Sequence, residues 1–152
     1  MLAARLTLAV AALCAGMAAA AAKDIAPGDV KIVDGTLAQA VSDAPASAAD
    51  GRKFFADRKL GNCLACHANS DMSEQLFHGD VGPSLDGVAE RWTPDQLRAI
   101  VVNSKAVFGD QTVMPGFYSL DVGKHVAKDF QGKTILTAEQ VESIVAYLAT
   151  LK

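Results

Sequence analysis

Apolar residues near the end of the chain recur at the spacing of one helix face. They stand at i, i+3, i+4, i+7 and i+10, namely Val141, Ile144, Val145, Leu148 and Leu151. Just before them, Thr137 and Gln140 have the three-residue spacing of a capping box, in which each side chain accepts a hydrogen bond from the other residue's main-chain N–H. The pattern predicts an amphipathic helix that begins after Thr137.

A second stretch with the same periodicity lies in the middle of the chain. Thr93 is followed by Pro94, and proline is favoured at the first position of a helix because its missing N–H has no partner there anyway. Leu97, Ile100 and Val101 then fall on one side. We predict a second helix that starts at Pro94 with Thr93 as its N-cap.

A third predicted helix lies further upstream, with Ser47 or Asp50 as its cap. Its apolar side is formed by Gly51, Phe54 and Phe55. We expect this helix to end near residues 60–62 and to lead directly into Cys63.

Two long blocks, Ala68 to Ala89 and Asn103 to Leu136, separate the predicted helices. Loops of this length argue against a compact domain unless they enclose something large and apolar. The pattern therefore predicts an all-α fold of about three to five helices, with long loops wrapped around one bulky group.

The chain of 152 residues suggests three segments. Residues 1–22 combine Arg5 with an uncharged stretch that ends in alanines, which is typical of a signal peptide cleaved near Ala20–Ala22. A retained membrane anchor is the weaker alternative, because alanine is only slightly lipophilic. Residues 23–47, rich in small residues, Pro and Gly, are expected to form an extended N-terminal arm, either a linker or a segment that packs on a partner. Residues 48–152 form the expected domain.

The charge balance limits the kinds of partner. Removal of residues 1–22 takes away one basic residue and leaves 13 Lys and Arg against 17 Asp and Glu, a net charge of −4. Such a chain has no positive excess with which to neutralise phosphates, so we expect neither nucleic acid nor, after signal cleavage, a membrane as its partner.

The cleaved chain keeps two cysteines, in the stretch Cys63-Leu-Ala-Cys66-His67. C-x-x-C-H is the attachment pattern of haem c, in which both sulfurs lie on one side of a turn and the histidine ligates the iron. A redox dithiol, half of a zinc site and a plain disulfide are the alternatives. A redox dithiol would need a βαβ context. A zinc site needs four ligands, for which the cleaved chain has, besides His67, only the two cysteines, His78 and His125. We therefore predict one covalent haem c per chain, bound through Cys63 and Cys66, with His67 as the proximal ligand.

The other ring nitrogen of an iron-bound histidine is usually fixed by a hydrogen bond. Gly82-Pro83-Ser-Leu85 follows His67 by about sixteen residues, and G-P-x-L segments of cytochromes c provide the proline carbonyl for this bond. Pro83 is the expected acceptor. An ordinary Gly-Pro turn is the alternative.

The distal ligand has to come from another part of the chain. The candidates are Met72, His78, Met114 and His125. Met72 follows His67 too closely to reach the opposite face, whereas Met114 is 47 residues away and stands before Pro115, which stiffens the backbone. We expect Met114 to be the distal ligand, with His125, His78 or an open position as alternatives. Ligation by His and Met favours electron transfer over chemistry at the iron, so no catalytic residue is predicted.

The helix pattern resembles that of class I cytochromes c, in which a glycine and an aromatic residue of the first helix cross an aromatic-Leu pair of the last. Gly51 and Phe55 would here meet Tyr147 and Leu148. The gap of eight residues from Phe55 to Cys63 is longer than usual in that fold, so the first helix is expected to break before the haem motif.

Several blocks resemble the SoxX family, the monohaem subunits of SoxAX cytochromes of sulfur oxidation. They are Gly61 to His67, Gly82 to Leu85, Ala89 to Trp92, Met114 to Tyr118 and Gly132 to Val141. The resemblance implies a periplasmic heterodimer with a SoxA-type subunit, in which thiosulfate is oxidatively joined to a cysteine of the carrier SoxYZ. This chain would accept the electrons and pass them to a soluble cytochrome c. It would be enzymatic only as part of such an L-cysteine S-thiosulfotransferase complex.

Two other functions remain open from the residues alone. The chain could be a free, diffusible respiratory cytochrome c, or it could use an open or weakly ligated iron to act on a small molecule. Neither the acidic balance nor the segment 119–136 decides between them.

Overall fold

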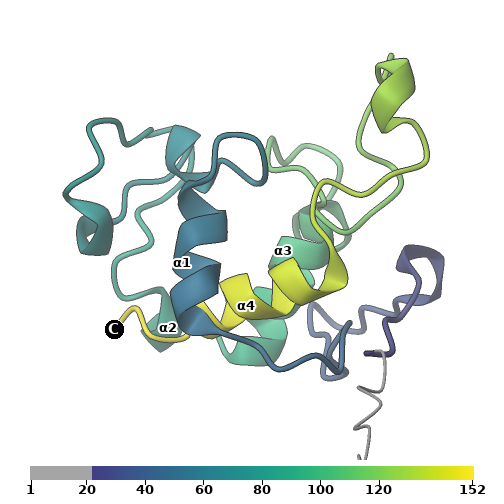
Figure 1. Ribbon diagram of the computed structural model, residues 1–152, viewed down its shortest axis with the longest axis horizontal. Helices are drawn as coiled ribbons and strands as arrows, with labels where there is room; N and C mark the ends of the chain where they lie inside the picture. Colours follow the sequence, from purple (N-terminus) through teal and green to yellow (C-terminus); the bar gives the residue numbers. More distant parts are fainter. Residues whose placement is uncertain (1–21) are drawn as a thin grey trace, which may run out of the picture.

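The computed structural model describes residues 22–152, and their regular structure is helical (Figure 1). The α-helices are α1 (Ala48–Ala56), α2 (Val88–Arg91), α3 (Pro94–Phe108) and α4 (Ala138–Leu148). Short 3₁₀ turns are η1 (Pro27–Asp29), η2 (Cys63–Ala65), η3 (Ser70–Met72) and η4 (Lys128–Phe130). Extended pairing within the described range is limited to two isolated bridges. The predicted all-α class is therefore confirmed, while the predicted signal peptide, apart from Ala22, lies outside the described residues.

Helices α1 and α4 cross at Gly51, and theirs is the most extensive contact between described helices. A Cβ atom on Gly51 would lie 1.8 Å from the main-chain oxygen of Ser143, so only glycine allows the two backbones to approach this closely. One turn further along, the rings of Phe55 and Tyr147 pack edge to face with their centroids 5.6 Å apart. The crossing inferred from the class I cytochrome pattern is present.

Helix α1 is shorter than its sequence pattern predicts. It ends at Ala56, because Asp57 adopts an extended conformation, and its carboxylate and carbonyl organise the turn that follows. Asp57 accepts hydrogen bonds from the main-chain N–H groups of Lys59, Leu60 and Asn62. The expected end near residues 60–62 was therefore wrong, and the expected break before Cys63 lies at this turn.

All three predicted helix starts have an N-cap, and at α1 the cap is Ser47, whose hydroxyl accepts from the N–H of Asp50. The hydroxyls of Thr93 and Thr137 accept hydrogen bonds from Gln96 and Gln140, whose side chains accept in return from the threonine N–H groups. Helix α3 nevertheless extends beyond the predicted start of a loop at Asn103. Asn103 is non-helical, and the helix resumes after it and continues to Phe108.

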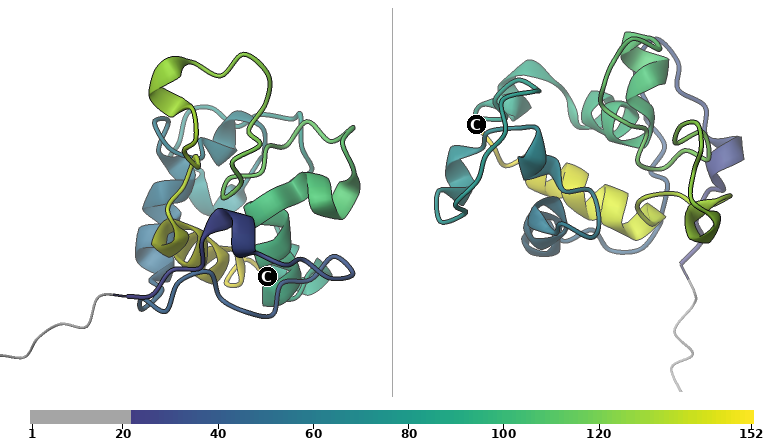
Figure 2. Two further views of the ribbon diagram at one scale, coloured as in Figure 1. Left: turned by 90° about the vertical axis from the view of Figure 1, so that its right-hand side faces the viewer. Right: turned by 90° about the horizontal axis from the view of Figure 1, so that it is seen from above.

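The segment 23–47 lies against α3 and α4 rather than free of them. Leu37 and Val41 are buried, and the N–H of Val41 donates to the buried carboxylate of Glu142. Arg98 of α3 donates to the same carboxylate and to the carbonyl of Leu37. One ion pair thus fastens the arm to both helices, which the composition of the segment does not indicate. In Figure 2 the arm follows the outside of the helical core.

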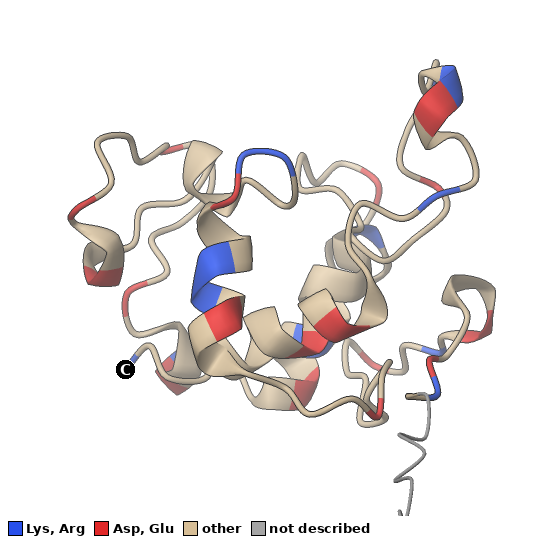
Figure 3. Ribbon diagram, in the orientation of Figure 1, with Lys and Arg blue, Asp and Glu red and all other residues tan. Residues whose placement is uncertain are grey.

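The loop that carries η4 projects from the rest of the molecule, as the yellow-green ribbon in Figure 1 shows. Basic and acidic residues are interspersed along the helices and loops in the view of Figure 3. Among residues 22–152, no helix is both long and apolar enough to cross a bilayer.

Candidate functional site

A cavity of about 660 Å³ lies between the segment that follows α1 and the loop that follows α3. Its walls are mostly apolar side chains from all four described α-helices and from the connecting loops. Such a cavity falls within the range of roughly 300–1,000 Å³ typical of cofactor and ligand pockets. The residues with chemically distinctive side chains on its wall are Cys63, Cys66, His67, Arg91 and Met114.

The turn η2 presents Cys63 and Cys66 to this cavity. The N–H groups of Cys66 and His67 both donate to the carbonyl of Cys63, which curls the motif into a tight turn. The two thiols are free and partly buried. Burial raises the pKa of the Cys63 thiol to about 12, so this sulfur is held as a neutral thiol at the cavity wall.

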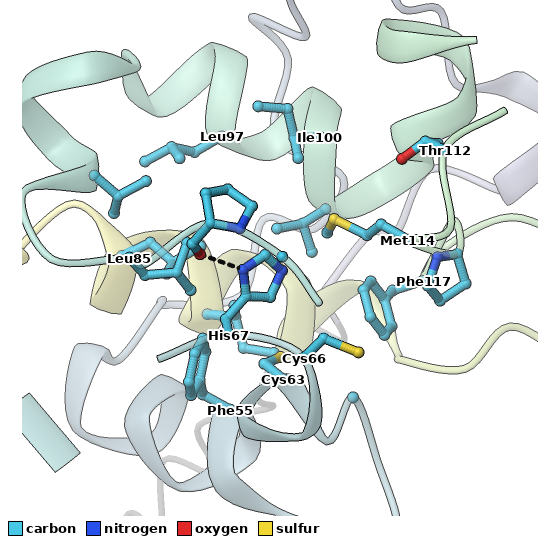
Figure 4. A pocket seen from close by; sticks show the side chains of 18 of the residues that line it. Phe55, Cys63, Cys66, His67, Leu85, Leu97, Ile100, Thr112, Met114 and Phe117 are labelled. Atoms are coloured by element: carbon cyan, nitrogen blue, oxygen red, sulfur yellow. Dashed lines mark hydrogen bonds between the residues drawn. The ribbon is translucent and has the colours of Figure 1, made fainter. Parts of the chain in front are cut away.

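His67 is oriented by a hydrogen bond to Pro83, drawn as the dashed line in Figure 4. Its Nδ1 lies 2.7 Å from the carbonyl oxygen of Pro83. Because a carbonyl oxygen only accepts, Nδ1 carries the proton and donates it. The lone pair is therefore on Nε2, the nitrogen a metal would use.

The Pro83 segment is itself fastened to the motif on both sides. Gly82 N–H donates to the carbonyl of Cys66 at 2.8 Å, and Leu85 N–H donates to that of Ala68 at 2.9 Å. The carboxylate of Asp86 accepts from both the N–H and the hydroxyl of Ser70, each at 2.7 Å. These bonds lower the pKa of Asp86 below its ordinary value.

The distal side of the cavity contains Met114, which follows the end of α3. Figure 4 shows its thioether and the His67 imidazole directed into the same cavity from different parts of the chain. Of the four distal candidates named from the sequence, Met114 alone lines the cavity.

The other three candidates lie elsewhere. Met72 is fully buried outside the cavity wall. His78 Nδ1 accepts from the N–H of Asn69 at 3.2 Å, so its Nε2 carries the proton, which it donates to the carbonyl of Met72 at 3.1 Å. His125 is exposed, with a positive φ of 59°, on the projecting loop. Neither His78 nor His125 lines the cavity that Cys63 and Cys66 enter.

The family model for cytochrome c matches residues 48–152. The chain belongs to the cytochrome c family. Members of this family bind haem c covalently, and the cavity with its C-x-x-C-H turn gives this cytochrome the corresponding site. The chain is therefore an electron-transfer haem protein.

Among solved structures, this cytochrome is similar to SoxXA from P. pantotrophus, with 38% sequence identity and a TM-score of 0.78. The match covers 86% of this chain and 99% of the other. It supports a SoxX-type cytochrome within the family, in agreement with the blocks noted in the sequence.

Weaker likenesses extend to two other cytochromes. SorU from Sinorhizobium meliloti has 26% identity and a TM-score of 0.45, with 68% of this chain and 88% of the other covered. Cytochrome c-550 from Paracoccus versutus has 20% identity and a TM-score of 0.37, with 70% and 98% covered. A search of curated protein sequences found no match.

The cavity of this cytochrome fits a haem on several independent grounds. Its wall is apolar, as a porphyrin requires, and its two thiols lie beside a histidine whose Nε2 is free to bind iron. Gly82 leaves room for the imidazole, since a Cβ atom there would lie 2.3 Å from Cε1 of His67. The residues that would hold the group are thus Cys63, Cys66, His67 and Met114.

Arg91 of α2 is a cavity residue that the sequence pattern did not reveal. Arg91 and His67 are the two basic residues among the described residues of the cavity wall. Nη1 and Nη2 of Arg91 donate to the carbonyls of Asp86 and Ser84, each at 2.7 Å. This fixes a positive charge at the cavity wall, which would offset the negative charge of the haem carboxylates. The sequence signal for this arginine lies in the block Ala89 to Trp92, which resembles the SoxX family.

A second group of polar residues braces the loop after His67 against α4. The hydroxyl of Tyr147 donates to Asp71 at 2.7 Å and accepts from the fully buried Asn69 at 2.9 Å. Arg52 of α1 donates to the same Asp71 carboxylate at 2.9 Å. Burial raises the pKa of Tyr147 well above its usual range, while the bonds from Tyr147 and Arg52 lower the pKa of Asp71. The last helix thereby helps to position the proximal loop.

Proposed function

We propose that this cytochrome is the electron-accepting subunit of a SoxAX-type complex in the periplasm. In this proposal it pairs with a SoxA-type cytochrome subunit during the oxidative coupling of thiosulfate to a cysteine of the carrier protein SoxYZ. It then passes electrons to a soluble cytochrome c. The proposal is supported by the 38% identity to SoxXA over nearly the whole of that chain. The uncharged stretch before Lys23 supports export.

The proposed roles of the site residues follow from their geometry. Cys63 and Cys66 would hold the haem through thioether bonds, His67 would bind the iron through Nε2, and Met114 would supply the second ligand. When bound, haem supplies a one-electron Fe(III)/Fe(II) couple. The observation that carries this assignment is the bond from His67 Nδ1 to Pro83, since it leaves Nε2 free toward a cavity that Met114 also enters.

The protein's own contribution is to keep both iron positions occupied and to set the basicity of the histidine. The Pro83 carbonyl accepts the Nδ1 proton in a hydrogen bond and makes His67 a stronger electron donor. Met114 opposes this by favouring the reduced state. With His67 and Met114 both bound to the iron, no coordination position would be left for a substrate, which suits transfer of electrons.

Replacement of Met114 by alanine tests the ligand assignment. We expect the wild-type haem protein to be low-spin, with a sulfur-to-iron absorption band near the red end of the spectrum that Met114→Ala loses. The potential should fall in the variant, because a thioether stabilises ferrous iron. Met72→Ala is the matched control, a buried methionine outside the cavity whose loss should leave the band intact. A band that survives Met114→Ala, or a high-spin wild-type spectrum, would contradict the assignment.

The partner is tested separately by purification from sulfur-oxidising cells at native expression. We expect the chain to elute with a larger haem-containing subunit, and native mass spectrometry to show one covalent haem on this chain. Reduction of the haem by the partner complex on addition of thiosulfate and carrier protein should follow. A chain that elutes alone, without a haem-containing partner, would favour a free respiratory cytochrome c instead.

A further inference from the structure

The Met114 loop is seated on a break in α3. Inside this helix Asn103 has φ −153° and ψ 88°, an extended conformation that interrupts the i to i−4 hydrogen-bond ladder. The carbonyls of Val101 and Val102 stand just before Asn103, where the regular helical ladder is interrupted. Such carbonyls need donors when they are buried, as these residues are.

The loop that follows Met114 supplies those donors. Phe117 N–H donates to the carbonyl of Val101 and Tyr118 N–H donates to that of Val102, each at 3.1 Å. Two consecutive N–H groups of the loop thus bond to the two consecutive carbonyls that precede the break. These hydrogen bonds hold the loop in place against the break in α3.

Ser104, which follows the break, forms a hydrogen bond with the main chain of Met114. Ser104 is fully buried, and its hydroxyl donates to the carbonyl of Met114 at 2.5 Å and also lies 3.3 Å from that of Pro115. The next residue, Lys105, donates through Nζ to the carbonyl of Thr112 at 2.7 Å. The main chain is thus held just before Met114, at Met114 and just after it.

Gly116 permits this close approach. A Cβ atom there would lie 3.0 Å from Cβ of Ser119, 3.1 Å from Oδ1 of Asn103 and 3.2 Å from the carbonyl oxygen of Val102. These separations are shorter than ordinary contacts, so a side chain at this position would push the loop away from the break.

We propose that Ser104 is a positioning residue for the distal ligand, and that the broken α3 is a preformed seat which determines how firmly Met114 is held at the iron. This rests on Met114 being the distal ligand. A fixed backbone leaves the methionine side chain fewer conformations, so less entropy is lost when its sulfur binds. A loosened backbone lets an added ligand displace the Met114 sulfur more readily. It also lowers the potential, because the bond between that sulfur and the iron is weaker.

The test compares Ser104→Ala with Ser104→Cys and Gly116→Ala in the haem-loaded protein. Imidazole is titrated into the ferric form while the red-end absorption band is followed. We expect the apparent affinity for imidazole to rise about tenfold in Ser104→Ala, the effect of losing one well-formed hydrogen bond. Ser104→Cys, which keeps a weak donor, should lie between Ala and the wild type. Gly116→Ala should change the affinity in the same direction by moving the loop.

Ser143→Ala is the matched control. Ser143 is also a buried helical serine, and its hydroxyl accepts a hydrogen bond from the N–H of Ser47 on the α1 side of the molecule. Its replacement should lower the free energy of unfolding but leave the imidazole affinity and the potential unchanged. This separates a local effect on Met114 from general destabilisation.

The outcomes separate the ligand assignment from the proposed seat. If Met114→Ala leaves the red-end band in place, the ligand assignment fails. If Met114→Ala removes the band but Ser104→Ala binds imidazole with wild-type affinity, the assignment stands and the seat is refuted. The seat is also refuted if Ser143→Ala raises the imidazole affinity as much as Ser104→Ala does.

Discussion

Replacement of both Cys63 and Cys66 by alanine is expected to abolish covalent haem retention and, with it, the cooperative fold. The cavity of about 660 Å³ is walled by residues of all four described α-helices, so an unfilled centre leaves the apolar faces of these helices without a partner. When a bound group completes the core of a small domain, its binding energy becomes part of the folding energy. The double variant should therefore lack the sharp unfolding transition of the wild type.

The measurement is haem absorbance per chain after acid–acetone extraction, which removes haem that is not covalently bound. Each single variant should retain one thioether and a reduced haem content, and the double variant none. Ser73→Ala, an exposed substitution in the loop after the motif, should retain the wild-type content. One haem per chain in the extracted double variant would rule out attachment through these cysteines.

Gly51→Ala is expected to cause the largest loss of stability of any single methyl addition outside the haem site. The new Cβ would lie 1.8 Å from the oxygen and 2.4 Å from the carbonyl carbon of Ser143, both main-chain atoms that no side-chain rotation can move. Helices α1 and α4 would have to separate, which would also open the contact between Phe55 and Tyr147. Overpacking of this kind costs about 3 kcal/mol or more in the free energy of unfolding.

Guanidinium denaturation of the haem-loaded protein measures this loss. Gly28→Ala provides the comparison, because a Cβ atom at Gly28 meets nothing within 4 Å and its backbone is not in the left-handed region. That variant should differ from the wild type by no more than about 0.5 kcal/mol. Equal midpoints for Gly51→Ala and the wild type would mean that the helices do not cross as closely as the structure places them.

The haem-filled core and the α1–α4 crossing are different sources of stability. The core is completed by the bound group, whereas the crossing is a contact between two backbones. Phe55 links them, since it packs on Tyr147 and also lines the cavity. A change at the α1–α4 crossing should therefore alter the surroundings of the haem. We expect the haem absorption of folded Gly51→Ala to be shifted relative to the wild type.

Much of the helical framework was predictable, because its signals are local. The N-cap at Thr93 and the capping box at Thr137 form as predicted, and Thr93 also forms a capping box; each joins residues only three apart in the chain. The amphipathic pattern from Val141 onward needs only a core on one side to become α4. By contrast, the short helix α2 and the early end of α1 were not predicted, since the first has too few residues for a period and the second depends on the turn at Asp57.

The break in α3 could not be predicted from the chain. The pattern indicated a loop from Asn103, whereas the helix continues to Phe108 after a single non-helical residue. The loop around Met114 bonds to α3 at this break, where its N–H groups donate to the carbonyls of Val101 and Val102. Long-range partners of this kind override local helix preference, and their identity depends on packing.

The amino-acid order alone predicted the chemistry of attachment, because Cys63, Cys66 and His67 lie within five residues and their spacing sets the geometry of a turn. It also gave four candidates for the opposite ligand, favoured Met114 among them, and named Pro83 as the partner of His67. The folded structure was needed to bring Met114 to the cavity wall and to hold both ring nitrogens of His78 in hydrogen bonds elsewhere. It was also needed to place Arg91 on the cavity wall and the Ser104 hydroxyl against the Met114 loop. These positions depend on hydrogen bonds between segments far apart in the chain, and such bonds exist only once the helices have packed.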